Sequence, residues 1–153
     1  MPRMVQALEQ EVIKIFNEQI EDVQKVASRI ATAYQTYSQG AQGPLGDPVV
    51  LKGVEFKGFE SSLAALMKGQ APPPQAAGQI VQAITAFWLA PPVATGTGGV
   101  CVSIIPAAAM AKMVSSRADT PAKAAGNLAN SLHLMTSTVF VVYPPPRPPG
   151  LLL

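Results

Sequence analysis

The stretch "TSTVFVVY" (136–143) is the clearest strand in the chain, and it runs directly into "PPPRPPGLLL" (144–153). β-branched and aromatic residues dominate 136–143, a composition typical of β-structure. Phe140 and Val142 would lie on one face of the strand, and the other face is also apolar. We therefore expect both faces to be covered, which predicts a sheet inside the body of the protein.

The proline-rich stretch that follows predicts an extended arm. Proline removes backbone donors and clashes with the preceding helical turn, so 144–153 cannot be a helix. A ligand for a polyproline-binding domain stays open because the extended shape is preformed, although no complete PxxP consensus with its basic residue is present. We expect the arm to reach a neighbouring chain through these residues: Pro144, Pro145, Pro146, Arg147, Leu151, Leu152 and Leu153.

The N-terminal region carries a continuous apolar stripe, which predicts one amphipathic helix over residues 3–38. Such a helix would be roughly 50 Å long, which exceeds the diameter expected of a domain of this size. We expect part of its stripe to contact another chain, while a helix broken once and folded back on its own domain stays open. The interface residues expected on the stripe are Val5, Leu8, Val12, Phe16, Ile20, Val23, Ile30 and Tyr34.

The region between these two ends predicts a small, mainly helical body. Helices are expected at 59–69, 76–90, 106–116 and 119–135, an extended link at 49–56, and a strand or helix start at 100–105. The predicted fold class is α+β, mainly α, with a few strands in an Ala/Gly-rich body. The expected divisions are a long helix (1–38), a loop and extended link (39–58), a compact body (59–143) and a Pro-rich arm (144–153).

The composition indicates a chain that is covered by other subunits. Of its 153 residues, 48% are hydrophobic and only 13% are charged, about half the usual charged share of soluble proteins. Residues 1–60 hold 14 of the 20 charged residues, so we expect residues 61–153 to be mostly buried. The net charge of +2 does not favour nucleic-acid binding. A membrane protein is the rival explanation, but the longest apolar run, 100–114, is interrupted by Pro106 and Lys112 and is too short to span a bilayer.

Catalytic, cofactor-binding and metal-ligating residues are not expected. The single histidine, His133, has no carboxylate close in sequence, since Asp119 lies nearly four helical turns away. Cys101 sits in an apolar run, which favours a buried inert thiol, and a lone cysteine excludes an internal disulfide. The loop "GTGG" (96–99) completes neither a phosphate-binding nor a dinucleotide-binding motif. The expected site residues are therefore those of an interface, in a protein made in the cytoplasm without a secretory signal.

The segments "AFWLAPPVATGTGGV", "PAAAMAKM" and "ADTPAKAAGNLANSLHLMTSTVFVVYPPP" all fall within residues 86–146, about 40% of the chain. In these segments the chain resembles the small virion proteins of tailed bacteriophages, especially ring or completion subunits of the tail, neck or baseplate. The resemblance implies a non-enzymatic virion subunit that packs against copies of itself and other virion proteins. The alternative is an intracellular adaptor whose long helix pairs with a partner and whose Pro-rich tail recruits a polyproline-binding domain.

Overall fold

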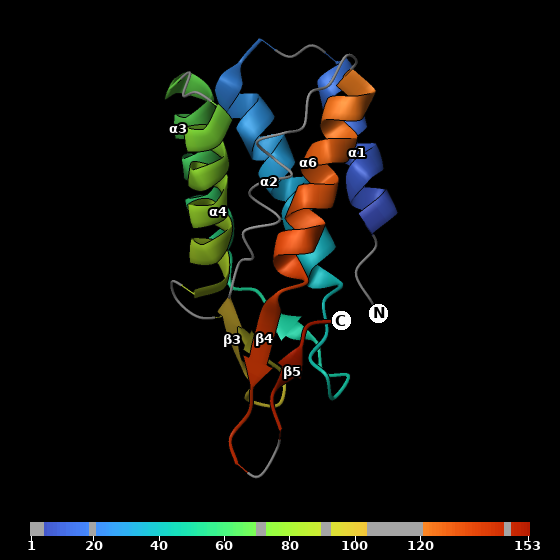
Figure 1. Ribbon diagram of the computed structural model, residues 1–153, viewed down its shortest axis with the longest axis vertical. Coiled ribbons are helices and arrows are strands. Elements are labelled where there is room, and N and C mark those ends of the chain that lie inside the picture. The colour runs from blue at the N-terminus through green and yellow to red at the C-terminus, as the bar shows by residue number, and fades with distance from the viewer. Residues whose placement is uncertain (1–4, 19–20, 70–72, 90–92, 104–120, 146–147) are drawn as a thin grey trace.

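The computed structural model describes residues 5–18, 21–69, 73–89, 93–103, 121–145 and 148–153, which form a helical layer at one end and a small sheet at the other (Figure 1). The helices are α1 (Val5–Asn17), α2 (Val23–Gln39), α3 (Val54–Gly69), α4 (Pro73–Leu89) and α6 (Pro121–Thr136). The strands are β1 (Val49–Val50), β2 (Ala94–Thr95), β3 (Val100–Ser103), β4 (Val139–Val142) and β5 (Gly150–Leu151). The α+β, mainly α, fold class is confirmed, whereas the helix expected at 106–116 lies outside the described residues.

The N-terminal region forms two helices, so the prediction of one continuous helix over 3–38 was wrong. Asp22 is the N-cap of α2, and its carboxylate accepts a hydrogen bond of 3.0 Å from the Gln24 N–H. An N-cap satisfies a backbone donor that has no helical partner, which favours a helix start at this point. Arg29 of α2 pairs with Glu18 at the end of α1, and α1 packs against both α2 and α6. The alternative of a broken helix folded back on its own domain is the one observed.

Helix α3 begins five residues earlier than expected, because a side chain caps its first turn. The Glu55 carboxylate is buried and accepts hydrogen bonds from the backbone N–H groups of Lys52 and Gly53. These donors would otherwise lack partners at the helix start, where a negative charge is also favourable. The extended link predicted at 49–56 is consequently shortened to β1.

The helical layer is held by an aromatic cluster centred on Tyr34. The Tyr34 ring packs 5.1 Å from Phe59 and 5.0 Å from Phe87, measured between ring centroids. The indole N–H of Trp88 donates to the Tyr34 hydroxyl at 3.0 Å, and that hydroxyl shares a 2.6 Å hydrogen bond with Thr136. Buried hydroxyl and indole groups need such partners, and here they join α2, α4 and α6 into one core.

The sheet is antiparallel, and its strands lie in chain order from β1 to β5. It curls until residues 41–43 join its two edges. On one side Val49 N–H donates to Ala41 and Gly43 N–H donates to Asp47, at 3.2 and 2.7 Å. On the other side the backbones of Gln42 and Leu153 exchange two hydrogen bonds of 3.1 and 2.9 Å. Residues 41–43 thus connect the β1 edge of the curled sheet to Leu153, just beyond β5, and we call the sheet together with these residues the ring.

The C-terminal residues belong to this ring, so the prediction of an arm leaving the body was wrong for them. β5 pairs antiparallel with β4, with Phe140 opposite Leu151 and Val141 opposite Gly150. Leu152 is buried, and its N–H donates to Val139 at 2.9 Å. The proline-rich stretch is therefore the loop of a hairpin, which forms because apolar residues on both sides of it can pair and bury one face.

Candidate interaction surface

One face of the sheet is apolar and exposed. Residues directly opposite each other on adjacent strands point to the same side of a sheet, so the strand register defines its rows. The first row runs from Val50 through Ala94 and Val100 to Val142. The second row runs from Val102 through Phe140 to Leu151.

These rows form what we call the outer patch: Val50, Val100, Val102, Phe140, Val142 and Leu151. Each of these residues is between 37% and 47% exposed. A single exposed apolar residue is ordinary on a protein surface, but here six of them lie in two neighbouring rows. The two rows lie two residues apart along the strands, so their side chains are neighbours. Exposed apolar side chains gathered on the outside of the ring make it the candidate interaction surface of the described residues.

Charge is almost absent around the outer patch. We call the described residues of 41–53, 93–103 and 137–153 the sheet end, which lies opposite the helical layer in Figure 1. Among them only Asp47 and Lys52 are charged, and Asp47 is buried. The exposed charges of the described chain consequently lie on the helices and their connections, apart from Lys52. Among the residues that the structure describes, the helical end is charged and the sheet end is almost uncharged.

Polar groups nevertheless form a hydroxyl–carboxylate cluster, in which Asp47, Thr95 and Tyr143 are buried and Thr97 is exposed. The hydroxyls of Tyr143 and Thr97 each donate to the Asp47 carboxylate at 2.7 Å. The Thr95 hydroxyl accepts from the Gly99 N–H at 2.9 Å. The cluster joins the loop before β1, the β2–β3 turn and the end of β4.

The cluster keeps Asp47 ionised. Burial by itself would raise the pKa of the Asp47 carboxyl, but hydrogen bonds from Thr95, Tyr143 and Thr97 outweigh burial and lower that pKa well below its usual range. Burial and the hydrogen bond to Asp47 raise the pKa of Tyr143. Hydrogen bonds that hydroxyl groups donate to a carboxylate stabilise its charged form and therefore lower its pKa.

Two glycines make this arrangement sterically feasible. A Cβ at Gly43 would collide with the Tyr143 hydroxyl and lie 2.5 Å from an Asp47 carboxylate oxygen. A Cβ at Gly99 would lie 2.5 Å from Val141 Cγ1 and 2.7 Å from the Thr95 hydroxyl oxygen. Gly99 of the "GTGG" loop thus leaves room for the Val141 and Thr95 side chains against its backbone.

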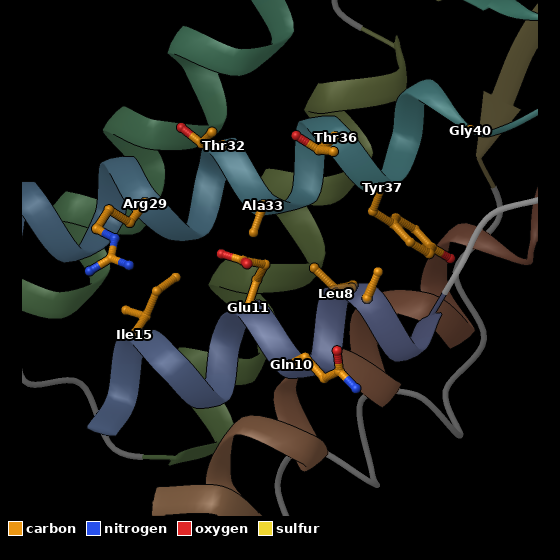
Figure 2. A pocket seen from close by; sticks show the side chains of 11 residues that line it. Leu8, Gln10, Glu11, Ile15, Arg29, Thr32, Ala33, Thr36, Tyr37 and Gly40 are labelled. Atoms are coloured by element: carbon orange, nitrogen blue, oxygen red, sulfur yellow. The ribbon is translucent and has the colours of Figure 1, made fainter. Parts of the chain in front are cut away.

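A separate groove of about 600 Å³ lies between α1 and α2 (Figure 2). Leu8 and Ile15 line it from α1, and Ala33 and Tyr37 line it from α2. Glu11 points into the space between the two helices, and Gln10, Arg29, Thr32 and Thr36 complete the polar lining. The surface that lines this groove is mainly apolar, and Glu11 and Arg29 add charged groups to it.

The expected interface residues of the N-terminal stripe mostly lie inside the protein. Leu8, Val12, Ile30 and Tyr34 are at most 2% exposed, because the stripes of both α1 and α2 face the chain's own core. Val5, Phe16 and Val23 are half-buried, and Ile20 lies outside the described residues. The four buried side chains are therefore not available to a second chain while the fold is intact.

The expected arm residues are divided between the two sides of the ring. Leu151 and Leu153 are exposed, Leu152 is buried, and Pro144 and Pro145 are exposed in the hairpin loop. Pro146 and Arg147 lie outside the described residues.

The interface residues expected from the sequence did not include Val50, Val100, Val102, Phe140 or Val142. The expectation that both faces of the strand at 136–143 would be covered was wrong for Phe140 and Val142, which are exposed. For Val100 and Val102 the available signal was the alternation within "VCVS", but Val100, Cys101 and Val102 are all apolar, so their polarity does not indicate which face is open.

His133 and Cys101 occupy structural positions. Nδ1 of His133 shares a 2.6 Å hydrogen bond with the Tyr37 hydroxyl, which joins α6 to α2. Cys101 is fully buried, and burial together with the negative charge of Asp47 raises its pKa to about 12. Within the described ranges no three His, Cys, Asp or Glu residues are grouped to hold a metal ion. No helix in that part of the chain has both the length and the apolar character to cross a membrane.

The comparisons with known proteins leave the surface to be interpreted from its own chemistry. No protein-family model, curated protein or solved structure matches this chain.

Proposed function

We propose that this chain is a non-enzymatic structural subunit of a homo-oligomeric assembly. The observation that carries the proposal is the division of the molecule into a charged helical end and an almost uncharged sheet end. An uncharged end with exposed valine, leucine and phenylalanine side chains is costly in water and favourable against another apolar surface. Such a subunit requires no cofactor, metal ion or substrate.

The assembly that we propose is a virion component of a tailed bacteriophage, in the tail, neck or baseplate. This part rests on the resemblance of residues 86–146 to small virion proteins. It agrees with the low charged share of the chain, since subunits in a closed assembly replace solvent-facing surface with contacts to their neighbours. Mass spectrometry of purified phage particles tests this location. We expect peptides from this chain in the particles and none in the soluble fraction of the host alone.

The test of the structural role is the native mass of the purified protein. We expect a defined oligomer by native mass spectrometry and by light scattering coupled to gel filtration, because the sheet end is poorly solvated in a monomer. A chain that stays monomeric at about 0.1 mM, a concentration at which a micromolar complex is saturated, would contradict the proposal.

The adaptor remains a second candidate because Pro144, Pro145, Pro148 and Pro149 are exposed in the β4–β5 loop. A polyproline-binding domain needs an extended segment, and here β4 and β5 fix both ends of the loop. If the protein is an adaptor, we expect a monomer that binds such a domain through this loop. If it is a structural subunit, we expect an oligomer that forms without such a domain.

A further inference from the structure

The groove between α1 and α2 has the size and the lining of a site for a small organic molecule. Its volume of about 600 Å³ lies within the roughly 300–1,000 Å³ that is typical of such sites. These sites are mostly apolar and have a few polar groups that orient the ligand. Here Leu8, Ala33 and Tyr37 contribute apolar surface from the two helices. The groove therefore fits the apolar body of a small molecule.

One of the two charged side chains that line the groove already has a partner. The Arg29 guanidinium forms an ion pair with the Glu18 carboxylate at the end of α1. The positive charge of Arg29 is thus balanced within the chain. An anionic ligand would have to compete with Glu18 for this guanidinium, so the groove attracts an anion only weakly.

Glu11 is the charge that remains. Figure 2 shows its side chain in the space between the two helices, with the carboxylate turned toward α2. It forms no hydrogen bond or ion pair with the described residues, and it is exposed, so a ligand can reach it. Leu8 and Ile15 lie one helical turn before and after it, on the same side of α1. An unbalanced negative charge therefore lies beside apolar surface.

We propose that this groove binds a small amphipathic cation, an organic molecule with an apolar body and a protonated amine. The apolar body lies against Leu8, Ile15 and Ala33, which removes apolar surface from water. The ammonium group donates hydrogen bonds to the Glu11 carboxylate, and charge-assisted hydrogen bonds of this kind are the strong ones. The inference goes beyond the proposed function and does not depend on it, because the groove lies in the helical layer and not at the sheet end.

Isothermal titration calorimetry on the full chain compares three ligands that share one carbon chain: octylamine, 1-octanol and octanoate. At neutral pH the first is a cation, the second is uncharged and the third is an anion. We expect saturable binding of octylamine at a single site, with an affinity about tenfold higher than that of octanol, because only the amine pairs with Glu11. Octanoate should bind more weakly than octanol, because the Glu11 carboxylate repels it.

Two glutamine substitutions on α1 test the role of the Glu11 charge. Glu11→Gln keeps the shape of the side chain and should lower the affinity for octylamine about tenfold, without changing the affinity for octanol. Glu9→Gln makes the same change on the same helix. The Glu9 carboxylate faces α6, since one of its oxygens lies 3.2 Å from the position of a Cβ at Gly126. This control should bind octylamine as the wild type does.

A third substitution tests the apolar part of the groove. Ala33→Leu places a larger side chain in the groove and should abolish the binding of octylamine and octanol alike. Fluorescence of the single tryptophan, Trp88, monitors the fold of each variant because this side chain is fully buried in the helical layer. If Ala33→Leu loses that signal, Ala7→Leu replaces it, because Ala7 also lines the groove and is exposed.

Each other occupant of the groove has its own result. If octylamine does not bind, or binds equally well to Glu11→Gln and to the wild type, the proposal is wrong. Octanol that binds as tightly as octylamine would show an apolar site without charge selection, and a preference for octanoate would show that Arg29 selects the ligand; both overturn the proposal. An oligomer whose mass in light scattering falls when octylamine is added would assign the groove to a neighbouring chain. The calorimetric results do not depend on whether the wild type is an oligomer, so the proposed function is tested separately.

Discussion

Asp47 shows how one residue in a loop can hold a sheet together. Its sequence context, "GPLGDP", marks a turn, and the turn is present. Its carboxylate, however, is buried and accepts hydrogen bonds from hydroxyls that follow β2 and β4. Those partners lie about 50 and 96 positions further along the chain, so local sequence carries no sign of them. A buried carboxylate whose donors all favour the charged form contributes stability only while it is ionised.

Asp47→Asn should lower the free energy of unfolding by about 1–3 kcal/mol at pH 7, because an amide offers one acceptor oxygen and turns an N–H₂ group toward a hydroxyl donor. Because the folded pKa of Asp47 is depressed, the wild-type advantage is full above its ordinary value of 3.8 and is lost as the pH falls through the folded value. Urea unfolding followed by Trp88 fluorescence, at matched protein concentrations, measures both effects.

The control for this prediction is Asp22→Asn, the same change at the N-cap of α2, where asparagine caps about as well as aspartate. It should be nearly neutral at pH 7. A loss at Asp47 no larger than at Asp22, or a difference that grows as the pH falls below 3.8, would show that the cluster does not stabilise the fold.

The strands and helices differ in how well local patterns predicted them. Helix α6 and strand β4 lie within a few residues of the predicted 119–135 and 136–143, because the helical period and the β-branched run are local signals. The break between α1 and α2 was missed because the apolar stripe continues across it, since both helices face the same core. The C-terminal hairpin was missed because the pairing of β5 with β4 depends on contacts across the proline loop. Deleting 144–153 should therefore destabilise the fold, whereas the arm hypothesis expected only assembly to fail.

Two adjacent leucines test the placement of β5. Leu152→Asp buries a carboxylate for which the described ring offers no cation, and it should cost at least the ~2–5 kcal/mol typical of replacing a buried leucine by alanine. Leu151→Asp changes a side chain that is 46% exposed on the other face, and it should alter monomer stability by no more than about 0.5 kcal/mol. Urea unfolding at low protein concentration distinguishes the two.

If both leucine variants unfold at the same urea concentration as the wild type, the terminal residues are not part of the ring. If both are equally destabilised, the alternation of β5 between an inner and an outer face is wrong. In either case the C-terminal leucines would again be candidates for an arm that reaches another chain.

At the scale of the whole molecule, the low share of charged residues is the feature of the sequence that predicts assembly. The shortage of charge predicted a covered surface, but it did not say which surface. The N-terminal stripe was the natural candidate because its amphipathic pattern is strong, and the fold uses that pattern for its own core. The exposed apolar side chains instead come from short strands that are distant in sequence, and only the strand register places them in rows.

The division into a charged and an uncharged end also predicts how the assembly responds to salt. An interface between charged helical ends is weakened when salt screens its ion pairs, and the screening length falls from about 10 Å at 0.1 M to 3 Å at 1 M ionic strength. An assembly held through the outer patch, whose residues are uncharged, should keep its mass over the same range. Sodium sulfate, which favours burial of apolar surface, should strengthen it. Light scattering at low and high sodium chloride, and then in sodium sulfate, measures the mass of the oligomer under each condition. An oligomer that dissociates as the sodium chloride concentration rises would place the contact on the helical end.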